Sequence, residues 1–419
     1  MFEGTDGHEI YSSTDHATTL EYADGKIKVK QFGEASGSAI RVLKNGKLGF
    51  SYFVAENERR NAFNNAMAAS KYSEKTKFAF PKQAKYPKVK TYSKKTAGIE
   101  ETELRGILGQ IIDGMKTYAK RSKVIVEAGC SDVSITNSSG MNANGTYSNF
   151  TAYCEAMCEK GMGFGYYSGV EPAKNPYELG NLAGRMANMM DKPEKLETGK
   201  HTVVLSIEAL HSMLDILLPS LSGELKRKKI SALWNKNGEK ILSEKFTLLD
   251  NPFADASNAS EFDGEGVACG KKMLFERGVL KNFFYNLETA ALEGAGKKGS
   301  CSRNSFASKP SVSPSNLVVA SGNFDSFTEE LGEFIYVRSV HGVHTSNTTT
   351  GDFGVEANIA FRMNGKGSRK GDEIGLKGFI ISGNIFNMFN SIIGLEKKQK
   401  TYDNLISPDI AFKDVQIIG

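Results

Sequence analysis

The stretch HTVVLSIEALHSMLDILLPSLSGEL, residues 201–225, combines histidines, an acid and an apolar stripe. His211 and Asp215 are one helical turn apart, a spacing at which two side chains can approach one ligand. A helical zinc protease, however, needs two imidazoles one turn apart and a carboxylate that activates water. No second imidazole stands at that spacing, and Pro219 has no backbone N–H and collides with the preceding turn. We therefore expect a helix that bends near Pro219 and carries no zinc site.

The same helix must be held by its apolar side. Its stripe consists of Ile207, Leu210, Leu214, Leu217, Leu218 and Leu221. His211 lies at the edge of this stripe, where a histidine is usually a boundary residue with a hydrogen-bond partner rather than a ligand.

A second polar group lies in VHGVHTSNTTTGDF. His341, His344, Asn347 and Asp352 occur there among many hydroxyl groups. Such a loop could line a pocket for a peptide or a metal, although the same composition is ordinary in turns. We regard these four residues as candidates for substrate binding.

Two other motifs have simpler explanations. Gly294, Gly296 and Gly299 spell GxGxxG, but NLETAALE before them looks helical rather than strand-like, which predicts a helix that ends at a glycine. Cys154 and Cys158 could chelate zinc from one helix face, yet no second pair has matching spacing. Two core thiols are the prediction for the cysteines.

Composition sets the broad class. The chain has 419 residues, 40% of them hydrophobic, and a net charge of +5, which is too dilute to indicate a nucleic-acid or membrane partner. No apolar run reaches the ~20 residues of a bilayer span, and the five cysteines form no CxxC. We expect a soluble, cytoplasmic protein with reduced thiols.

The elements that position these residues fall into two halves. The first half, residues 1–198, contains a hairpin with its turn at Asn45-Gly46, helices near residues 104–118 and 179–190, and further strands between them. The second half, residues 199–419, is mostly short strand-like runs after one helix. This order predicts an α+β fold with a mixed α/β first domain and a mainly antiparallel β second domain.

A Lys-rich segment, residues 71–100, breaks the periodicity and is interpreted as a connector. Its lysines alternate with Tyr72, Phe78, Tyr86 and Tyr92, a pattern that could stack bases and hold phosphates. The favoured interpretation is that the aromatic rings anchor an irregular surface segment while the lysines stay solvated.

The chain resembles the TldD/PmbA family, also called modulators of DNA gyrase. The resemblance covers most of the chain and rests on NSSGMNANGTYSNF, LPSLSGEL, TLLDNPF, SEFDGEGVACGKKMLFERGVLKNFFYNLETAALEG, SNLVVASGN, HGVHTSNTTTGDFGVEANIAF and GFIISGN. It implies a two-domain α+β subunit of a cytoplasmic metallopeptidase that pairs with a relative and degrades unfolded or short peptides. The helix that usually opens the family's first domain is missing here.

In the TldD type, a helix carries HExxxH and a cysteine near the C-terminus completes the zinc site. By this resemblance Leu214 stands for the first histidine, Asp215 for the glutamate, Pro219 for the second histidine and Ser407 for the cysteine. The chain therefore looks like the PmbA (TldE) type, which lacks metal and partners the zinc subunit.

We expect no catalytic residue, metal or cofactor in this subunit, with zinc in a TldD-type partner. The partner is an HExxxH subunit in a heterodimer or a second copy in a homodimer. One alternative is a self-sufficient homodimeric metallopeptidase that uses His344, Asp352 or Asp263 and Glu265 with a non-standard metal site. Another is a regulatory module associated with nucleic acid or gyrase.

Overall fold

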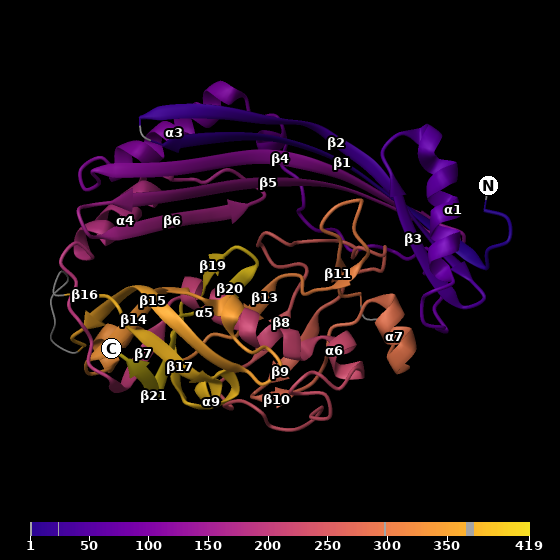
Figure 1. Cartoon of the computed structure of the whole chain (residues 1–419). Coiled ribbons are helices and arrows are strands. Elements are labelled where there is room, and N and C mark those ends of the chain that lie inside the picture. Colours follow the sequence, from indigo (N-terminus) through magenta and orange to yellow (C-terminus); the bar gives the residue numbers. More distant parts are fainter. Residues whose placement is uncertain (1, 24, 297–298, 366–372) are drawn as a thin grey trace.

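Six antiparallel strands of the first half form one sheet, the N-terminal sheet, which arches over the rest of the molecule (Figure 1). The computed structural model describes residues 2–23, 25–296, 299–365 and 373–419. The strand order is β3-β2-β1-β4-β5-β6. The bounds are β1 (Gly7–Ala23), β2 (Lys26–Lys44), β3 (Lys47–Phe53), β4 (Arg121–Asn137), β5 (Asn142–Met157) and β6 (Met162–Gly169).

The predicted hairpin joins β2 to β3. Lys44 pairs with Lys47, and the two turn residues Asn45 and Gly46 have φ values of 51° and 74°. Both values lie in the left-handed region that a two-residue hairpin turn of this kind requires. Strands β1–β3 and strands β4–β6 are far apart in the sequence. They join into one sheet where β1 pairs with β4, for example at Glu9 and Asn137.

Helices α3 and α4 cover one end of the N-terminal sheet (Figure 1). The helices of this half are α1 (Arg59–Ser70), α2 (Lys94–Ala97), α3 (Glu101–Met115) and α4 (Pro176–Met189). The helix predicted near residues 104–118 is α3, and it buries one apolar side, with Leu104, Leu108 and Ile111 fully covered. A Cβ atom at Gly180 of α4 would lie 1.9 Å from the carbonyl oxygen of Ile111, so the two helices can cross this closely only at a glycine.

The Lys-rich connector runs mostly without regular structure along the edge of β5 that β6 leaves uncovered. Ser148 donates its backbone N–H to the Thr91 carbonyl. Phe78 is buried, and Tyr86 packs against Phe262, whereas Tyr72 is 90% exposed. The lysines of the connector are all exposed. Anchoring by aromatic rings is thus confirmed for part of the segment.

The second half contains two larger sheets and a two-stranded one. Their orders are β10-β9-β8-β13-β20-β19, β14-β7-β21-β17-β15-β16 with β18 beside β21, and β11-β12; β14 also pairs with β15, so the second of these sheets closes on itself. Only β13–β20 and β14–β7 pair in parallel among the named strands. The α+β class and the mainly antiparallel second half are confirmed.

The strand bounds of the second half are β7 (Gly199–Leu205), β8 (Leu248–Asp250), β9 (Lys272–Glu276), β10 (Val279–Leu280), β11 (Cys301–Ser302), β12 (Ser311–Val312), β13 (Leu317–Val319), β14 (Phe334–His341), β15 (Asp352–Met363), β16 (Ile374–Leu376), β17 (Ile380–Asn384), β18 (Ile392–Leu395), β19 (Lys400–Tyr402), β20 (Leu405–Ser407) and β21 (Ile410–Ile418). Its helices are α5 (Ile207–Leu217), α6 (Gly223–Arg227), α7 (Leu287–Glu293), α8 (Phe327–Glu330) and α9 (Ile385–Asn390). Short 3-10 turns are η1 (Glu56–Glu58), η2 (Leu218–Leu221) and η3 (Val343–Thr345).

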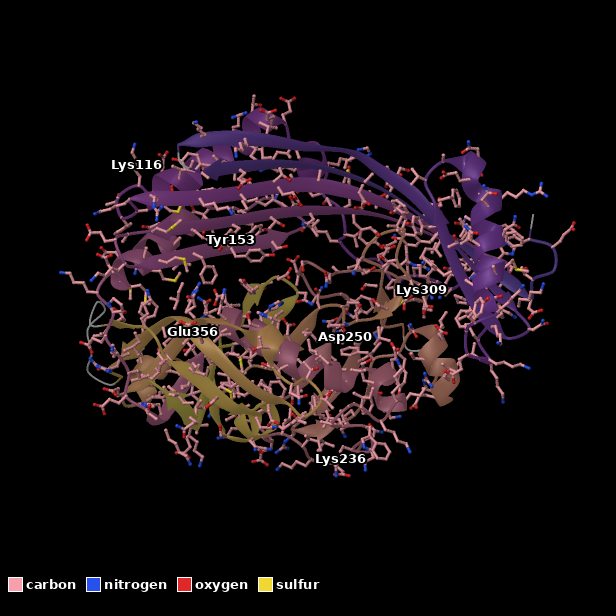
Figure 2. All side chains as sticks on the ribbon, in the orientation of Figure 1. Lys116, Tyr153, Lys236, Asp250, Lys309 and Glu356 are labelled. Atoms are coloured by element: carbon pink, nitrogen blue, oxygen red, sulfur yellow. The ribbon has the colours of Figure 1, made fainter. Side chains whose placement is uncertain are left out.

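The largest hydrophobic core lies in this half and surrounds α5. Every member of its predicted stripe is buried except Leu218, which is partly buried. One buried ion pair of this half joins Asp250, which is labelled in Figure 2, to Lys272; the carboxylate oxygen lies 3.1 Å from the ammonium nitrogen. Within the described ranges, no helix combines the length and the apolar character that crossing a bilayer requires.

Candidate functional site

Helix α5 brings the two polar residues of the opening stretch to one wall of a cavity. The helix begins after Ser206, whose hydroxyl accepts a hydrogen bond from the Ala209 N–H at 3.4 Å. It ends at Leu217, and the chain continues as the 3-10 turn η2 through Pro219. The predicted interruption near Pro219 takes the form of a change from α-helical to 3-10 geometry, because the missing N–H and the ring interrupt the α-helical ladder.

The α5 cavity has a volume of about 540 Å³, and its lining includes His211, Asp215 and Asn404. The His211 Nε2 lies 3.0 Å from the Asn404 Oδ1 and 3.9 Å from a carboxylate oxygen of Asp403. Partial burial raises the pKa of Asp215, and His211 one turn away opposes this rise. Tyr402 packs edge-on against the imidazole. The wall therefore offers hydrogen-bonding groups, and His211 already has a partner, as its border position predicts.

A zinc ion does not fit the residues of this cavity. Catalytic zinc takes three protein ligands, usually imidazole, carboxylate or thiolate. Leu214 and Pro219 have no donor atom, and the buried Ser407 hydroxyl donates to the Pro408 carbonyl at 2.8 Å. In the part of the chain that the structure describes, the only group of acids, histidines and cysteines close enough to share an ion lies elsewhere, at Asp263, Glu265 and Cys301.

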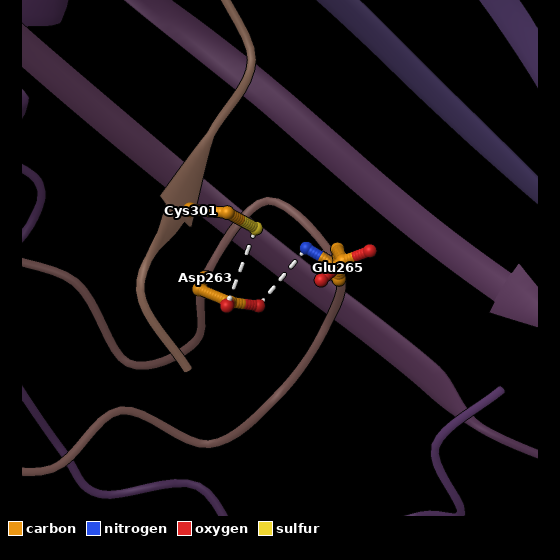
Figure 3. A group of neighbouring side chains, drawn as sticks. All are labelled: Asp263, Glu265 and Cys301. Carbon is orange, nitrogen blue, oxygen red and sulfur yellow. Dashed lines mark hydrogen bonds between the residues drawn. The ribbon is translucent and has the colours of Figure 1, made fainter. Parts of the chain in front are cut away.

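That group also fits an ion poorly, because its oxygens are already hydrogen bonded (Figure 3). One Asp263 oxygen accepts from the backbone N–H groups of Glu265 and Val267, and the other accepts from the Cys301 thiol at 3.3 Å. Burial raises the pKa of Asp263 to about 7, helped by the neighbouring Glu265 carboxylate. Asp263 can therefore gain or lose a proton near neutral pH.

A buried ion network ties this group to the N-terminal sheet. Arg41 of β2 donates to Glu9 of β1 at 2.9 and 2.6 Å and to Glu265 at 2.5 Å, and Arg303 donates to Glu9 as well. Burial alone would raise the pKa of Glu9, but the two guanidinium groups hold it below its ordinary value. Four charged side chains distant in sequence thus fix the sheet onto the second half.

The network borders a second cavity, the interlayer cavity, of about 490 Å³. Tyr11, Ile135 and Tyr147 of the N-terminal sheet line one side, and residues of segments 257–264 and 299–303 line the other. Asn258, Ser313, Pro314 and Asn404 line both this cavity and the α5 cavity. The two cavities are therefore adjacent and form one groove, of which only the interlayer part is lined by the N-terminal sheet.

The polar loop from His341 to Asp352 lies away from this lining. Neither cavity is lined by His341, His344, Asn347 or Asp352. The Asp352 carboxylate accepts from Thr350 and from the Asn384 amide, and these hydrogen bonds hold the pKa of Asp352 below its ordinary value. Both histidines are exposed. Among the described residues, Asp263 and Glu265 belong to a group close enough to share an ion, together with Cys301, whereas His344 and Asp352 do not.

The paired cysteines and the glycine motif both lie outside the groove. Cys154 lies in strand β5 and not on a helix; it is buried, and Cys158 just after the strand is partly buried, each with a thiol hydrogen bond to a backbone carbonyl. The GxGxxG glycines follow α7, which ends at Gly294 in the left-handed conformation, as predicted. Residues 297–298 of that motif lie outside the described residues.

Asp263 and Glu265 were among the residues named for the alternative metal site, whereas no sequence signal indicated Glu9, Arg41 and Cys301. Spacing along the sequence does not link positions near the N-terminus with a loop after residue 260. These residues can therefore be recognised as neighbours only in the folded structure, where the sheet packs on the second half.

Comparisons with known proteins agree along most of the chain. The family model described as PmbA/TldA metallopeptidase C-terminal domain matches residues 198–419, and that of metallopeptidase domain 1 matches residues 8–70. An uncharacterized protein of Methanocaldococcus jannaschii is 32% identical over 93% of this chain and 91% of its own length. A protein named metalloprotease from Methanothermobacter thermautotrophicus is 27% identical over 92% and 87%.

Solved structures show the same fold. TldE from Thermococcus kodakarensis superimposes with a TM-score of 0.89 at 21% identity, covering all of this chain and 98% of that one. A putative modulator of a DNA gyrase from Thermotoga maritima gives 0.87 at 22% identity, covering 98% and 96%.

Proposed function

The chain belongs to the PmbA/TldD metallopeptidase family, and from this premise we propose that it is a PmbA (TldE)-like subunit without its own metal, the partner of a TldD-type zinc peptidase. The observation that carries the proposal is the lining of the α5 cavity. Leu214 and Pro219 stand in this lining where the resemblance places the two zinc-binding histidines, and the nearby imidazole of His211 is held by Asn404. A subunit with this lining contributes binding surface rather than metal chemistry.

The ligand of the complex, in this proposal, is an unfolded or short peptide. Main-chain pairing with a sheet edge would hold such a peptide with little dependence on its sequence. The two cavities support peptide binding more generally, since their lining combines apolar and amide side chains. The loop residues His341, His344, Asn347 and Asp352 remain candidates for contacts outside the groove.

The partner proposal is tested by mixing the purified chain with an HExxxH relative from the same genome. We expect a stable complex by size-exclusion chromatography and faster cleavage of an unstructured peptide than by the relative alone. The control is the same mixture with both motif histidines of the relative replaced by alanine, which should form the complex without cleaving. Absence of both the complex and the gain in cleavage would refute the proposal.

The self-sufficient metallopeptidase is the competing function, and its only described donor group is Asp263, Glu265 and Cys301. Elemental analysis of the purified chain separates the two: stoichiometric zinc or manganese, lost in an Asp263→Asn variant, would support the competitor. The nucleic-acid alternative is not favoured, because the matching family model is described as a metallopeptidase domain and a relative is named a metalloprotease.

A further inference from the structure

A third cavity, the lysine pocket, lies at the turn of the β2–β3 hairpin and next to the end of α1, which Figure 1 shows beside β3. Its volume is about 720 Å³, and its lining includes Lys44, Lys47, Lys71 and Lys75. The other described residues of the lining are uncharged, so no carboxylate in it balances the four ammonium groups. Among the described residues, the lysine pocket shares none with the lining of the α5 cavity or the interlayer cavity.

Backbone pairing places three of these lysines side by side. Lys44 of β2 is paired with Lys47 of β3, and Lys47 is bridged in turn to Lys75 of the connector. Directly paired residues of antiparallel strands point to the same face, with Cβ atoms about 4.5–5.5 Å apart, and like charges at such positions destabilise a sheet. The stem of Lys75 reaches across the turn, because a Cβ atom at Gly46 would lie 3.2 Å from the Lys75 Cγ.

The groups around the lysine pocket leave this repulsion in place. The Lys47 Nζ donates to the backbone carbonyl of Lys71 at 2.9 Å, which fixes one ammonium group but does not neutralise it. The nearby Glu74 carboxylate lies 3.3 Å from the guanidinium of Arg227, and Asp6 accepts from the Gly46 N–H at 3.4 Å. Within the described ranges, none of the four lysines forms an ion pair with a carboxylate, so the pocket keeps a net positive charge.

Four like charges around one compact cavity suit a ligand that carries several negative charges close together. Lysine binds phosphate groups as a flexible point charge, whereas arginine, which the described lining lacks, is the usual partner of a planar carboxylate. The volume falls within the ~300–1,000 Å³ of small-molecule sites. Single-stranded nucleic acid instead needs a positive groove that follows its backbone over ~4–16 nucleotides. The pocket therefore favours a small anion with several phosphates.

From these observations we propose that the lysine pocket binds a small polyphosphate, either inorganic or part of a nucleotide. Lys44, Lys47 and Lys75 hold the phosphate oxygens in a row across the hairpin, and Lys71 closes the side next to α1. Binding relieves the repulsion among the paired lysines. This site goes beyond the proposed peptide-binding function and does not depend on it, because its lining is separate from the groove.

The test measures binding to the purified full chain by isothermal titration calorimetry, in a magnesium-free buffer of low ionic strength. The probes are inorganic triphosphate, ATP, a tetraglutamate peptide and a short single-stranded DNA. We expect triphosphate to bind at least about tenfold more tightly than the tetraglutamate peptide, the ratio given by one hydrogen bond to a charged group. ATP that binds as tightly as triphosphate assigns recognition to the phosphates alone; tighter binding adds a nucleoside contact, and weaker binding restricts the site to inorganic polyphosphate. Absence of triphosphate binding, or stronger binding of the peptide or the DNA, would overturn the proposal.

The double variant Lys44→Gln/Lys75→Gln removes two charges that repel Lys47, so the chain should fold. It should bind triphosphate at least about tenfold more weakly than the wild type. Lys85→Gln/Lys88→Gln is the matched control, because it makes the same change of net charge at exposed connector lysines outside the pocket. The control should keep the wild-type affinity within about twofold, since charges at a distance are screened. An equal loss in both variants, or no loss in the first, would show that the pocket is not the site. Neither result bears on the complex with the zinc relative.

Discussion

The protonation of Asp263 should make the stability of this protein depend on pH in an unusual direction. Its pKa is raised from 3.8 to about 7 in the folded chain, first by burial and then by the Glu265 carboxylate. A carboxyl with a higher pKa in the folded state holds its proton more tightly there than in the unfolded chain. Its contribution to the free energy of unfolding is therefore largest at low pH and declines as the pH rises from about 4 to about 7.

The substitution Asp263→Asn isolates this effect. Asparagine retains an oxygen for the N–H groups of Glu265 and Val267, which lie 2.9 and 3.0 Å from the Asp263 oxygen, and it resembles the protonated acid. One pKa unit corresponds to about 1.4 kcal/mol, so a rise from 3.8 to about 7 corresponds to about 4 kcal/mol. We expect the free energy of unfolding of the variant to exceed that of the wild type by up to this amount at pH 8.5. At pH 4.5 the two free energies should differ little.

Urea unfolding followed by far-ultraviolet circular dichroism at several pH values between 4.5 and 8.5 provides the measurement. The quantity to compare is the difference between variant and wild type, because other acids titrate equally in both. Asp255→Asn, at an exposed carboxyl, serves as the control and should give a difference that stays flat with pH. If the Asp263→Asn difference is also flat, Asp263 does not hold a proton in the folded chain at neutral pH.

Three further substitutions test the packing. Gly180→Ala should lower the free energy of unfolding by about 1–3 kcal/mol in urea denaturation, because its methyl group would meet the Ile111 carbonyl at 1.9 Å; an unchanged midpoint would show that α3 and α4 can separate freely. Arg41→Met leaves Glu9 with one guanidinium partner fewer in a buried site and should cost about 3–5 kcal/mol by the same assay. A loss below about 1 kcal/mol would mean that water replaces the network. Leu214→Ala should cost about 2–5 kcal/mol in thermal and urea unfolding, since the side chain is 1% exposed in the core around α5, and a neutral result would contradict that packing.

Local sequence information was sufficient wherever a few neighbouring residues decide the conformation. Asn45-Gly46 predicted a hairpin turn because few residue pairs adopt two successive positive φ values. The apolar spacing in α3 and α5 predicted which side of each helix is buried, and Pro219 predicted where α5 stops. The residue types at positions 214, 215 and 219 are likewise a property of the sequence itself, and they are enough to show that no pair of imidazoles stands there.

The sequence alone determined the classes of element, the apolar faces and, through the family resemblance, the missing zinc ligands. Only the tertiary structure decided that β1 pairs with β4, that Arg41 meets Glu265, and that Arg303 meets Glu9. These contacts join positions more than a hundred residues apart, and side-chain spacing along the chain carries no information about them. They arise when the curved sheet closes over the second half and forces buried charges to find partners, because an unpaired buried charge is too costly to remain.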